Sequence, residues 1–265
     1  MRWFDSHAHL QDEKFADDLP NVIERAKAAG VKRVLLPGAD YQSVVRAEKL
    51  AAEESDYFCY SSGIHPHDAD TVDDNMLNYI KTLAEGTGFH KPVAIGEVGL
   101  DYHYDFSPRN IQRAVFEQFI EIAWYYKLPL IIHCREATED CLSILRSKAA
   151  QGRLLTVPGV FHCFSGSAQT ADTLIDMGFY LGFDGPITFK NSRKAAEVIK
   201  IAPLERLLIE TDSPYLAPEP LRGKRNEPSY LPYIGRKLAE LKGISTEEAA
   251  DITWQNTCRL FQIPD

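Results

Sequence analysis

Five short apolar runs, each followed closely by a side chain that can bind a metal ion, constrain this 265-residue chain more than any other feature. Each run is too short to be a helix and is typical of a buried strand in a parallel sheet. Side chains that end different strands can converge only if the strands lie side by side and end on the same face. The runs and their end residues are Arg2–Phe4 with His7 and His9, Val93–Ile95 with Glu97, Leu130–Ile132 with His133, Val160–Phe161 with His162, and Leu207–Ile209 with Asp212.

Strand-like and helix-like segments alternate along the chain, which predicts a parallel sheet built from βα units. We predict strands near 2–7, 31–37, 57–64, 92–98, 129–134, 159–163, 179–184 and 207–212, and helices near 20–29, 41–54, 73–86, 108–126, 136–150, 168–178, 191–201, 229–243 and 245–261. Ser107 before Pro108 and Ser245 before Glu248 resemble helix starts. A (β/α)8 TIM barrel commonly uses about 250 residues. We therefore predict an α/β fold, a single-domain barrel over residues 1–265 with a metal site at the C-terminal face of its strands.

The spacing of His7 and His9 adds a second argument. Eight histidines in this chain give about 0.2 His-x-His pairs by chance, so the pair alone is weak evidence. Taken alone, such a pair would more often be packed or surface histidines than metal ligands. Residues i and i+2 of a strand point to the same face, so both imidazoles can reach one metal ion. Because His133 and His162 follow apolar runs in the same way, the pattern as a whole favours metal binding.

Composition excludes several classes of protein. A net charge of −9 argues against a protein that coats long nucleic acid, because such binding needs many phosphate contacts from a basic surface. No run approaches ~18 apolar residues and no signal peptide is evident, so we expect neither membrane insertion nor export. Five cysteines without a Cys-x-x-Cys pattern fit reduced thiols in the cytoplasm.

One local basic cluster is compatible with phosphate binding. Arg222, Lys224 and Arg225 lie in the predicted loop after the eighth strand, and further cations occupy residues 190–194, after the seventh. The alternative is an ordinary solvated loop. Because barrels often hold phosphate in these two loops, we expect Lys224 and Arg225 to contact an anionic substrate.

Six sequence blocks are informative together. They are Phe4–Leu10 (FDSHAHL), Gly63–Pro66 (GIHP), Ile95–Tyr102 (IGEVGLDY), His133–Arg135 (HCR), His162–Gly166 (HCFSG) and Glu210–Leu216 (ETDSPYL). In this order they resemble the signature blocks of TatD-type deoxyribonucleases, a branch of the metal-dependent amidohydrolase-like TIM barrels. The resemblance covers residues 4 to about 228 and also assigns the stretch 223–228 to the substrate side. One position departs from the family, because Asp184 stands where a small hydroxyl residue is expected.

Four imidazoles and two carboxylates are too many for one tetrahedral zinc ion, but they suit two metal ions bridged by a carboxylate and a water. Glu97 is the expected bridge, because it is the acidic residue that ends a mid-barrel strand. The donor types fit Mg²⁺, Mn²⁺ or Zn²⁺, and the resemblance favours Mg²⁺. The resemblance further implies that His7, His9 and Asp212 bind one ion and that His133 and His162 bind the other.

We expect Glu97 and Asp212 to be the catalytic carboxylates. Asp212 would hold one ion, orient the attacking water and act as the general base, which requires its ionised form. We assign His65, at the end of the third strand, to substrate contact, with a purely structural role as the alternative. Arg135 is a suitable phosphate clamp because a guanidinium matches two phosphate oxygens.

The loops at the same face hold further side chains whose roles stay open. Tyr102, Tyr104 and Phe164 could stack on bases, although a loop aromatic is more often a packing residue. We expect His67 and His90 to be ordinary loop residues.

The resemblance implies a divalent-metal-dependent nuclease that hydrolyses DNA phosphodiester bonds, as a 3′–5′ exonuclease on single-stranded DNA ends with RNA as a further substrate. A first rival is a small-molecule amidohydrolase or lactonase, which would use the same metal cage against a carbonyl carbon. A second rival is a binding protein that has lost catalysis. The basic loops weigh against the first rival and the complete set of ligand residues against the second. No membrane association and no obligate protein partner is indicated.

Overall fold

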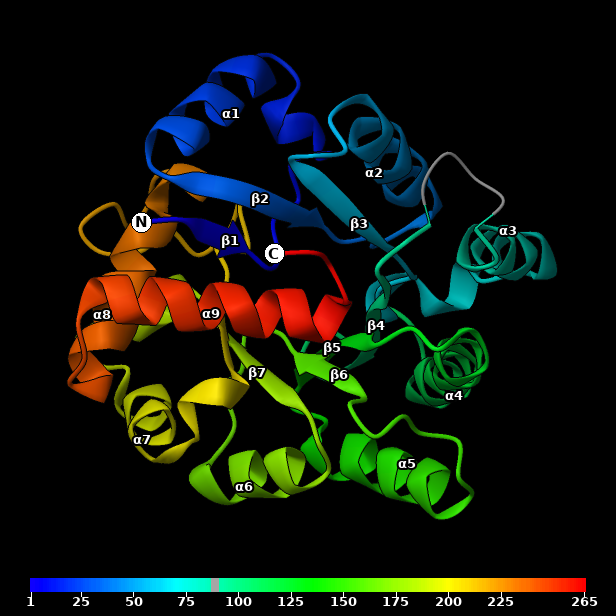
Figure 1. Ribbon diagram of the computed structural model, residues 1–265. Helices are drawn as coiled ribbons and strands as arrows, with labels where there is room; N and C mark the ends of the chain where they lie inside the picture. The colour runs from blue at the N-terminus through cyan, green and yellow to red at the C-terminus, as the bar shows by residue number, and fades with distance from the viewer. Residues whose placement is uncertain (87–90) are drawn as a thin grey trace.

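The computed structural model describes residues 1–86 and 91–265, and its strands form a parallel barrel in the order of the sequence, β1 to β8 (Figure 1). The barrel closes where the Ser6 N–H, just after β1, donates to the Ile209 carbonyl of β8 at 3.2 Å. The predicted (β/α)8 fold is confirmed, and each strand overlaps its predicted range, although β4 runs past the predicted end at residue 98. The strands are β1 (Trp3–Asp5), β2 (Val31–Leu36), β3 (Phe58–Ser62), β4 (Ala94–Asp101), β5 (Leu130–Arg135), β6 (Gly159–Phe161), β7 (Tyr180–Phe183) and β8 (Leu207–Ile209).

Helices surround the barrel, as the alternating pattern predicts. Local signals fix several helix starts: the Asp40 carboxylate accepts the Ser43 N–H at the start of α2, and the Ser245 hydroxyl accepts the Glu248 N–H at the start of α9. The predicted cap at Ser107 is wrong, because its hydroxyl donates to the His67 carbonyl instead. The helices are α1 (Leu19–Ala28), α2 (Tyr41–Glu53), α3 (Asp74–Ala84), α4 (Arg109–Tyr126), α5 (Thr138–Ala150), α6 (Ala168–Asp176), α7 (Arg193–Ile201), α8 (Leu231–Lys242) and α9 (Thr246–Phe261).

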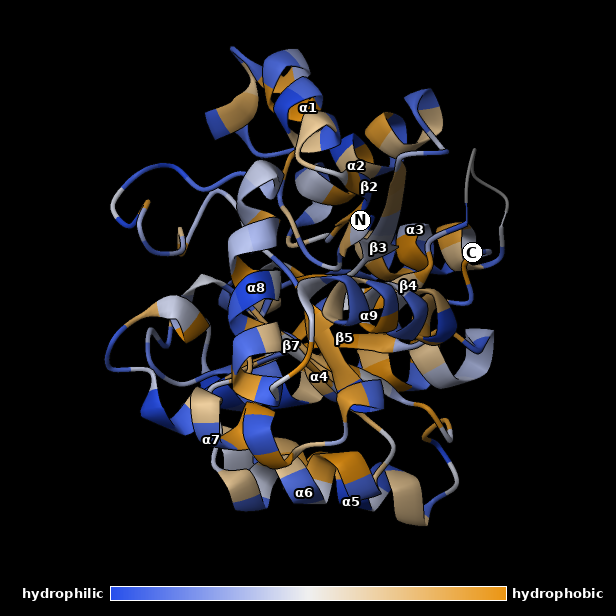
Figure 2. Cartoon of the chain, turned by 60° about the vertical axis from the view of Figure 1, so that its left-hand side comes forward, coloured by the Kyte–Doolittle hydropathy of each residue, from blue (hydrophilic) through white to orange (hydrophobic). Residues whose placement is uncertain are grey.

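The apolar residues form two separate layers. The larger layer lies between the strands and the surrounding helices, and in Figure 2 strand β5 at the centre is mainly hydrophobic while the helices around it alternate in hydropathy. The smaller layer fills the barrel interior, where side chains from alternate strand positions meet. Its strand residues are Phe4, Leu35, Ala94, Ile131, Val160, Tyr180 and Leu208.

Helix α9 closes the amino-terminal end of the barrel, across which it lies in Figure 1. Trp254 of α9 packs on Phe4 with ring centroids 5.6 Å apart, and the Asn256 amide donates to the Leu207 carbonyl at the start of β8. The opposite end, where the strands end, is left to the loops and to the candidate site. Within the described residues no helix combines the length and apolarity needed to cross a membrane.

Candidate metal centre

Two candidate ligands continue the alternation of their strands. Ile131 and Val160 belong to the interior apolar layer, and His133 and His162 follow each of them by two residues. Strand alternation therefore aims both imidazoles into the open end of the barrel, above a dry apolar floor.

Glu97 reaches the same place by a different route. Ala94 faces the interior, so simple alternation would turn Glu97 away from it. The register between β4 and β5 shifts after Ile95, and this irregularity brings the Glu97 side chain inward. The backbone here passes so close to β5 that a Cβ on Gly96 would lie 2.6 Å from the Ile131 Cβ, so only glycine fits.

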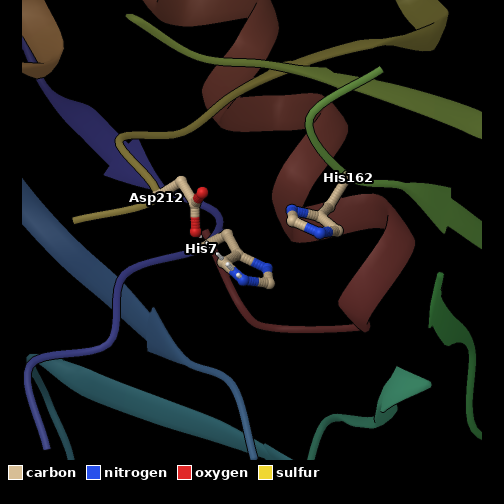
Figure 3. Close-up of side chains that lie close together, drawn as sticks. All are labelled: His7, His162 and Asp212. Carbon is tan, nitrogen blue, oxygen red and sulfur yellow. Dashed lines mark ion pairs between the residues drawn. The ribbon is translucent and has the colours of Figure 1, made fainter. Parts of the chain in front are cut away.

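The first group of donor atoms surrounds Glu97 Oε2. This oxygen is 3.2 Å from His7 Nε2 and 3.7 Å from His9 Nε2, and the two nitrogens are 3.2 Å apart. Asp212 Oδ1 is 3.7 Å from His7 Nε2 and 3.6 Å from His9 Nε2. Figure 3 shows Asp212 pointing at His7, with the His162 ring nearby. These four side chains come from the ends of β1, β4 and β8.

The second group surrounds the other Glu97 oxygen. Glu97 Oε1 is 2.7 Å from His162 Nε2, 3.0 Å from His133 Nδ1 and 3.5 Å from His65 Nε2. The His133 and His162 nitrogens are 3.3 Å apart. One carboxylate thus faces two sets of nitrogens, one through each oxygen. His65, which we expected to contact substrate, lies among the possible ligands.

The first group fits a bound cation. Four donors held tetrahedrally at 2.0–2.1 Å from a metal ion lie about 3.3 Å from one another, and the distances within the first group run from 3.2 to 3.7 Å. Burial lowers the pKa of His7 to about 3, so this imidazole is neutral at pH 7 and offers its lone pair. Neutral imidazoles and carboxylates gathered around one buried point are the donor set of a catalytic divalent-metal site.

Comparison with known proteins identifies the family of the chain. The profile of the family described as TatD related DNase matches residues 4–262. The chain belongs to the TatD family of metal-dependent hydrolases. The resemblance of the signature blocks is thereby confirmed.

Relatives agree over almost the whole length. The chain is 49% identical to "Uncharacterized metal-dependent hydrolase YabD" of Bacillus subtilis (strain 168), over 98% of this chain and 99% of that protein. It is 34% identical to "3'-5' ssDNA/RNA exonuclease TatD" of Rahnella sp. (strain Y9602), over 98% of each. The crystal structure of YjjV, a TatD homologue from Escherichia coli K12, superposes with a TM-score of 0.91 at 30% identity and covers 99% of both chains.

The electrostatics of this TatD-family site depend on Glu97 and Asp212. Burial alone would raise the pKa of Glu97, but the imidazoles of His162, His65 and His133 outweigh it and hold that pKa well below its usual range. Burial and the neighbouring carboxylates raise the pKa of Asp212 well above its usual range. A cation beside Asp212 would favour its ionised form, so metal binding and the charge of this side chain are coupled.

Two further carboxylates lie behind candidate ligand histidines, and Asp101 is the one within hydrogen-bond distance. Asp101 Oδ2 is 3.0 Å from His133 Nε2, on the side of the ring opposite Glu97. Glu210 Oε1 is 3.7 Å from His162 Nδ1, and this carboxylate also accepts the Ser6 hydroxyl and the Cys163 N–H. A hydrogen-bonded partner such as Asp101 fixes the ring plane and the tautomer of a metal-binding imidazole.

A cavity of about 700 Å³ opens above the site. Of the four predicted substrate contacts, His65 and Arg135 line it, whereas Lys224 and Arg225 do not. Arg225 is already engaged, because its guanidinium donates to both Asp18 carboxylate oxygens at 2.7 and 2.9 Å. The nearby Arg222 lies 4.4 Å above the Phe189 ring, so the loop after β8 offers fewer free cations than its sequence suggests.

The loop aromatics differ from expectation. Phe164 is buried, and the Tyr102 hydroxyl donates to Asp140 at 2.6 Å, so of the three candidates only Tyr104 lines the cavity. Phe106 lines it too and was not singled out by sequence.

Two polar residues of the site were also missed. His67, expected to be an ordinary loop residue, lines the cavity with its Nε2 2.9 Å from Asp101 Oδ2. Asp101 was missed because the fourth strand was predicted to end at residue 98, whereas β4 runs on to Asp101 and places a second acid at its end. His90 lies outside the described residues.

Proposed function

We propose that this protein is a divalent-metal-dependent nuclease that removes nucleotides from the 3′ end of single-stranded DNA, with RNA as a further substrate. The observation that carries the proposal is the position of Glu97, whose two oxygens face two separate sets of imidazole nitrogens at the floor of an open cavity. The Rahnella relative named as a 3′–5′ ssDNA/RNA exonuclease supports the substrate class.

In this proposal His7, His9 and Asp212 hold one divalent ion, His133 and His162 hold a second, and Glu97 serves both. When bound, such ions make a water molecule more acidic and neutralise charge on phosphate oxygens. Mg²⁺ is our choice on resemblance, although the donor types also accept Mn²⁺ or Zn²⁺.

The protein's own side chains then position the reactants. Asp212 Oδ1 faces His7 and His9, which leaves Oδ2 to accept the proton of the attacking water. Arg135 is exposed on the cavity wall, where its guanidinium can bind two oxygens of the scissile phosphate. His65 lies 3.5 Å from Glu97 Oε1 and bounds the space left for the substrate.

One observation favours a rival. Asp12, Asp40 and Asp68 line the same cavity, and their negative charge disfavours a polyanion on that side. A small neutral ester or lactone would not meet this repulsion, so hydrolysis at a carbonyl carbon is the second candidate.

The test is the degradation of a 5′-labelled single-stranded oligonucleotide with Mg²⁺, Mn²⁺ or Zn²⁺ and with EDTA. We expect a ladder of products shortened from the 3′ end with metal and an intact strand with EDTA. The same oligonucleotide with a blocked 3′ end should resist. Turnover of lactones or aryl esters without hydrolysis of any oligonucleotide would overturn the nuclease in favour of the rival.

A further inference from the structure

Two exposed aromatic rings stand on the loop after β4, at the rim of the cavity. Tyr104 is 48% and Phe106 64% exposed, and their rings stack with centroids 5.2 Å apart and an interplanar angle of 12°. Adjacent apolar side chains that together form an exposed patch often indicate a binding site. The pair presents a flat apolar surface next to the candidate metal centre.

This surface is held in place before any ligand arrives. Asp101 Oδ1 accepts the backbone N–H groups of His103 and Tyr104 at 2.9 and 3.0 Å. Arg109 donates to both oxygens of Asp105 at 2.8 and 2.7 Å. A loop restrained from both sides loses little conformational entropy on binding, so stacking on it is more favourable than on a loose loop.

The His67 ring lies between the aromatic pair and the candidate ligand His133. The His67 centroid lies 4.8 Å from that of Phe106, 5.4 Å from that of Tyr104 and 6.2 Å from that of His133. Arg135 completes the surface, with its guanidinium carbon 4.8 Å from the Tyr104 centroid. Arg135 has no carboxylate partner in the described part of the chain, so its charge is available to an anion.

The charges around the cavity favour a phosphate chain on the side of Tyr104, Phe106 and Arg135. Asp12, Asp40 and Asp68 follow β1, β2 and β3, and Arg46, which lines the same cavity, has Glu13 3.7 Å away. The loop after β4 instead supplies the aromatic pair, and the last residue of β5 is Arg135. A strand of nucleic acid that reaches the metal centre is therefore attracted to the side of Arg135 and the aromatic pair, and repelled by the side of the three aspartates.

We propose that Tyr104, Phe106 and Arg135 form a nucleotide subsite, in which one base stacks on the exposed rings while the adjoining phosphate pairs with Arg135. Aromatic stacking tolerates every base, because each base has a π-face, so the subsite would hold a nucleotide without selecting its sequence. This inference rests on the proposed nuclease function, since it names the part of the nucleic acid that the rim holds.

The experiment measures binding, without turnover. Isothermal titration of the Mg²⁺-loaded protein would compare deoxyadenosine 5′-monophosphate with deoxyribose 5-phosphate, which lacks the base. We expect the nucleotide to bind about tenfold more tightly and Phe106→Ala or Tyr104→Ala to remove most of that difference. Arg135→Gln should weaken both ligands. Tyr125→Ala, which removes a 69% exposed ring on α4, is the matched control and should change neither affinity.

Equal binding of the two ligands to the wild-type protein would overturn the subsite, as would a base preference that survives both aromatic variants. Tighter binding of an aryl ester than of the nucleotide would assign the surface to another ligand and overturn it too. Failure of the nuclease proposal looks different: base-dependent binding would persist while no oligonucleotide was cut with any metal. Melting curves of the variants check that each one folds.

Discussion

At the scale of single residues, the centre depends on one buried carboxylate. Glu97 is 3% exposed and faces imidazole nitrogens through both oxygens, so in the proposed two-ion site both ions would share it. A buried carboxylate is costly unless cations or hydrogen-bond donors surround it. Glutamine, the neutral amide analogue of glutamate, has nearly the same size but carries no charge.

We expect Glu97→Gln to lower hydrolysis by at least about 10²-fold, because charge stabilisation around the substrate is lost. Metal content, measured by mass spectrometry after dialysis, should fall as well. Glu197→Gln, an exposed carboxylate on α7, is the control and should leave both unchanged. Near-normal turnover and metal content in Glu97→Gln would refute its assignment as the shared ligand.

Asp101 is a positioning residue for the second group of donors. It is fully buried and lies 3.0 Å from His133 Nε2. We expect Asp101→Asn to weaken metal binding about 10- to 100-fold, as loss of such a partner typically does, with the melting temperature as a check on folding. Asp105→Asn alters an exposed neighbour that pairs with Arg109 and should leave metal affinity unchanged. If both variants bound metal like the wild type, Asp101 would not orient His133.

Metal binding should also release a proton. Burial alone would lower the pKa of His133, but hydrogen bonds to Asp101 and Glu97 outweigh it and raise that pKa to about 9 in the metal-free protein. His133 is therefore protonated at pH 7.5 and must lose its proton to bind a cation through Nδ1. We expect the apparent metal affinity to rise with pH up to about 9. Titration calorimetry at pH 7.5 in buffers of different ionisation enthalpy would detect the proton, and a heat independent of buffer would contradict the prediction.

At the scale of elements, the sequence predicted the helices and strands that the hydrophobic period and the length of each segment determine. Short apolar runs such as Leu130–Ile132 are identified as strands by their length and β-branched content, because helices are usually longer. The irregular register of β4 was not predicted, because Gly96 and Gly99 within the strand indicate a bulge or a close backbone approach but do not specify that Glu97 turns inward. The cavity rim was predicted least well. Arg225 and Asp18 are 207 residues apart in the chain, and no local pattern indicates that they pair.

In addition to the Arg225–Asp18 pair, a second ion pair joins the loop after β8 to α1. Arg25 donates to the two oxygens of Glu227 at 2.8 and 2.6 Å, and Glu227 is only 4% exposed. We expect Arg25→Met to lower the free energy of unfolding by about 1–3 kcal/mol, because it leaves a mostly buried carboxylate without its partner. Arg109→Met removes an exposed pair and should cost less than about 1 kcal/mol. Denaturation with urea measures both.

The pH dependence of that effect has a definite sign. Burial would raise the pKa of Glu227, but its bonds to Arg25 and Ser229 outweigh burial and hold that pKa below its usual value. A lowered pKa in the folded state adds stability that is present above the unfolded pKa, about 4.3, and is lost as pH falls through the folded pKa. The gap between wild type and Arg25→Met should therefore shrink below about pH 4. A gap that stayed constant into acid would exclude this ion pair as its cause.

At the scale of the whole molecule, a net charge of −9 and a cavity bordered on one side by acids limit the length of nucleic acid that can be held. Sequence-independent binding of a long strand draws its affinity from many phosphate contacts. The cavity wall offers Arg135 together with a short aromatic surface, which in the proposed nuclease would hold a few terminal nucleotides. The protein should therefore depend on a free end to bring the scissile bond to the metal centre.

The decisive comparison is linear against circular single-stranded DNA of the same sequence, at equal Mg²⁺ and low salt. A terminal nucleotide can enter the cavity on the side of Arg135 and the exposed Tyr104 and Phe106 rings without carrying chain past the acidic loops after β1, β2 and β3. An internal segment must leave the cavity on both sides, and one of its arms meets those acids. We expect the circle to be cut at least about tenfold more slowly, because charge repulsion lowers its rate of productive binding. Raising the salt concentration should narrow the difference, since screening weakens the repulsion. Equal initial rates on the two substrates would show internal cutting and refute end-directed cleavage, even if the metal ligands are as proposed.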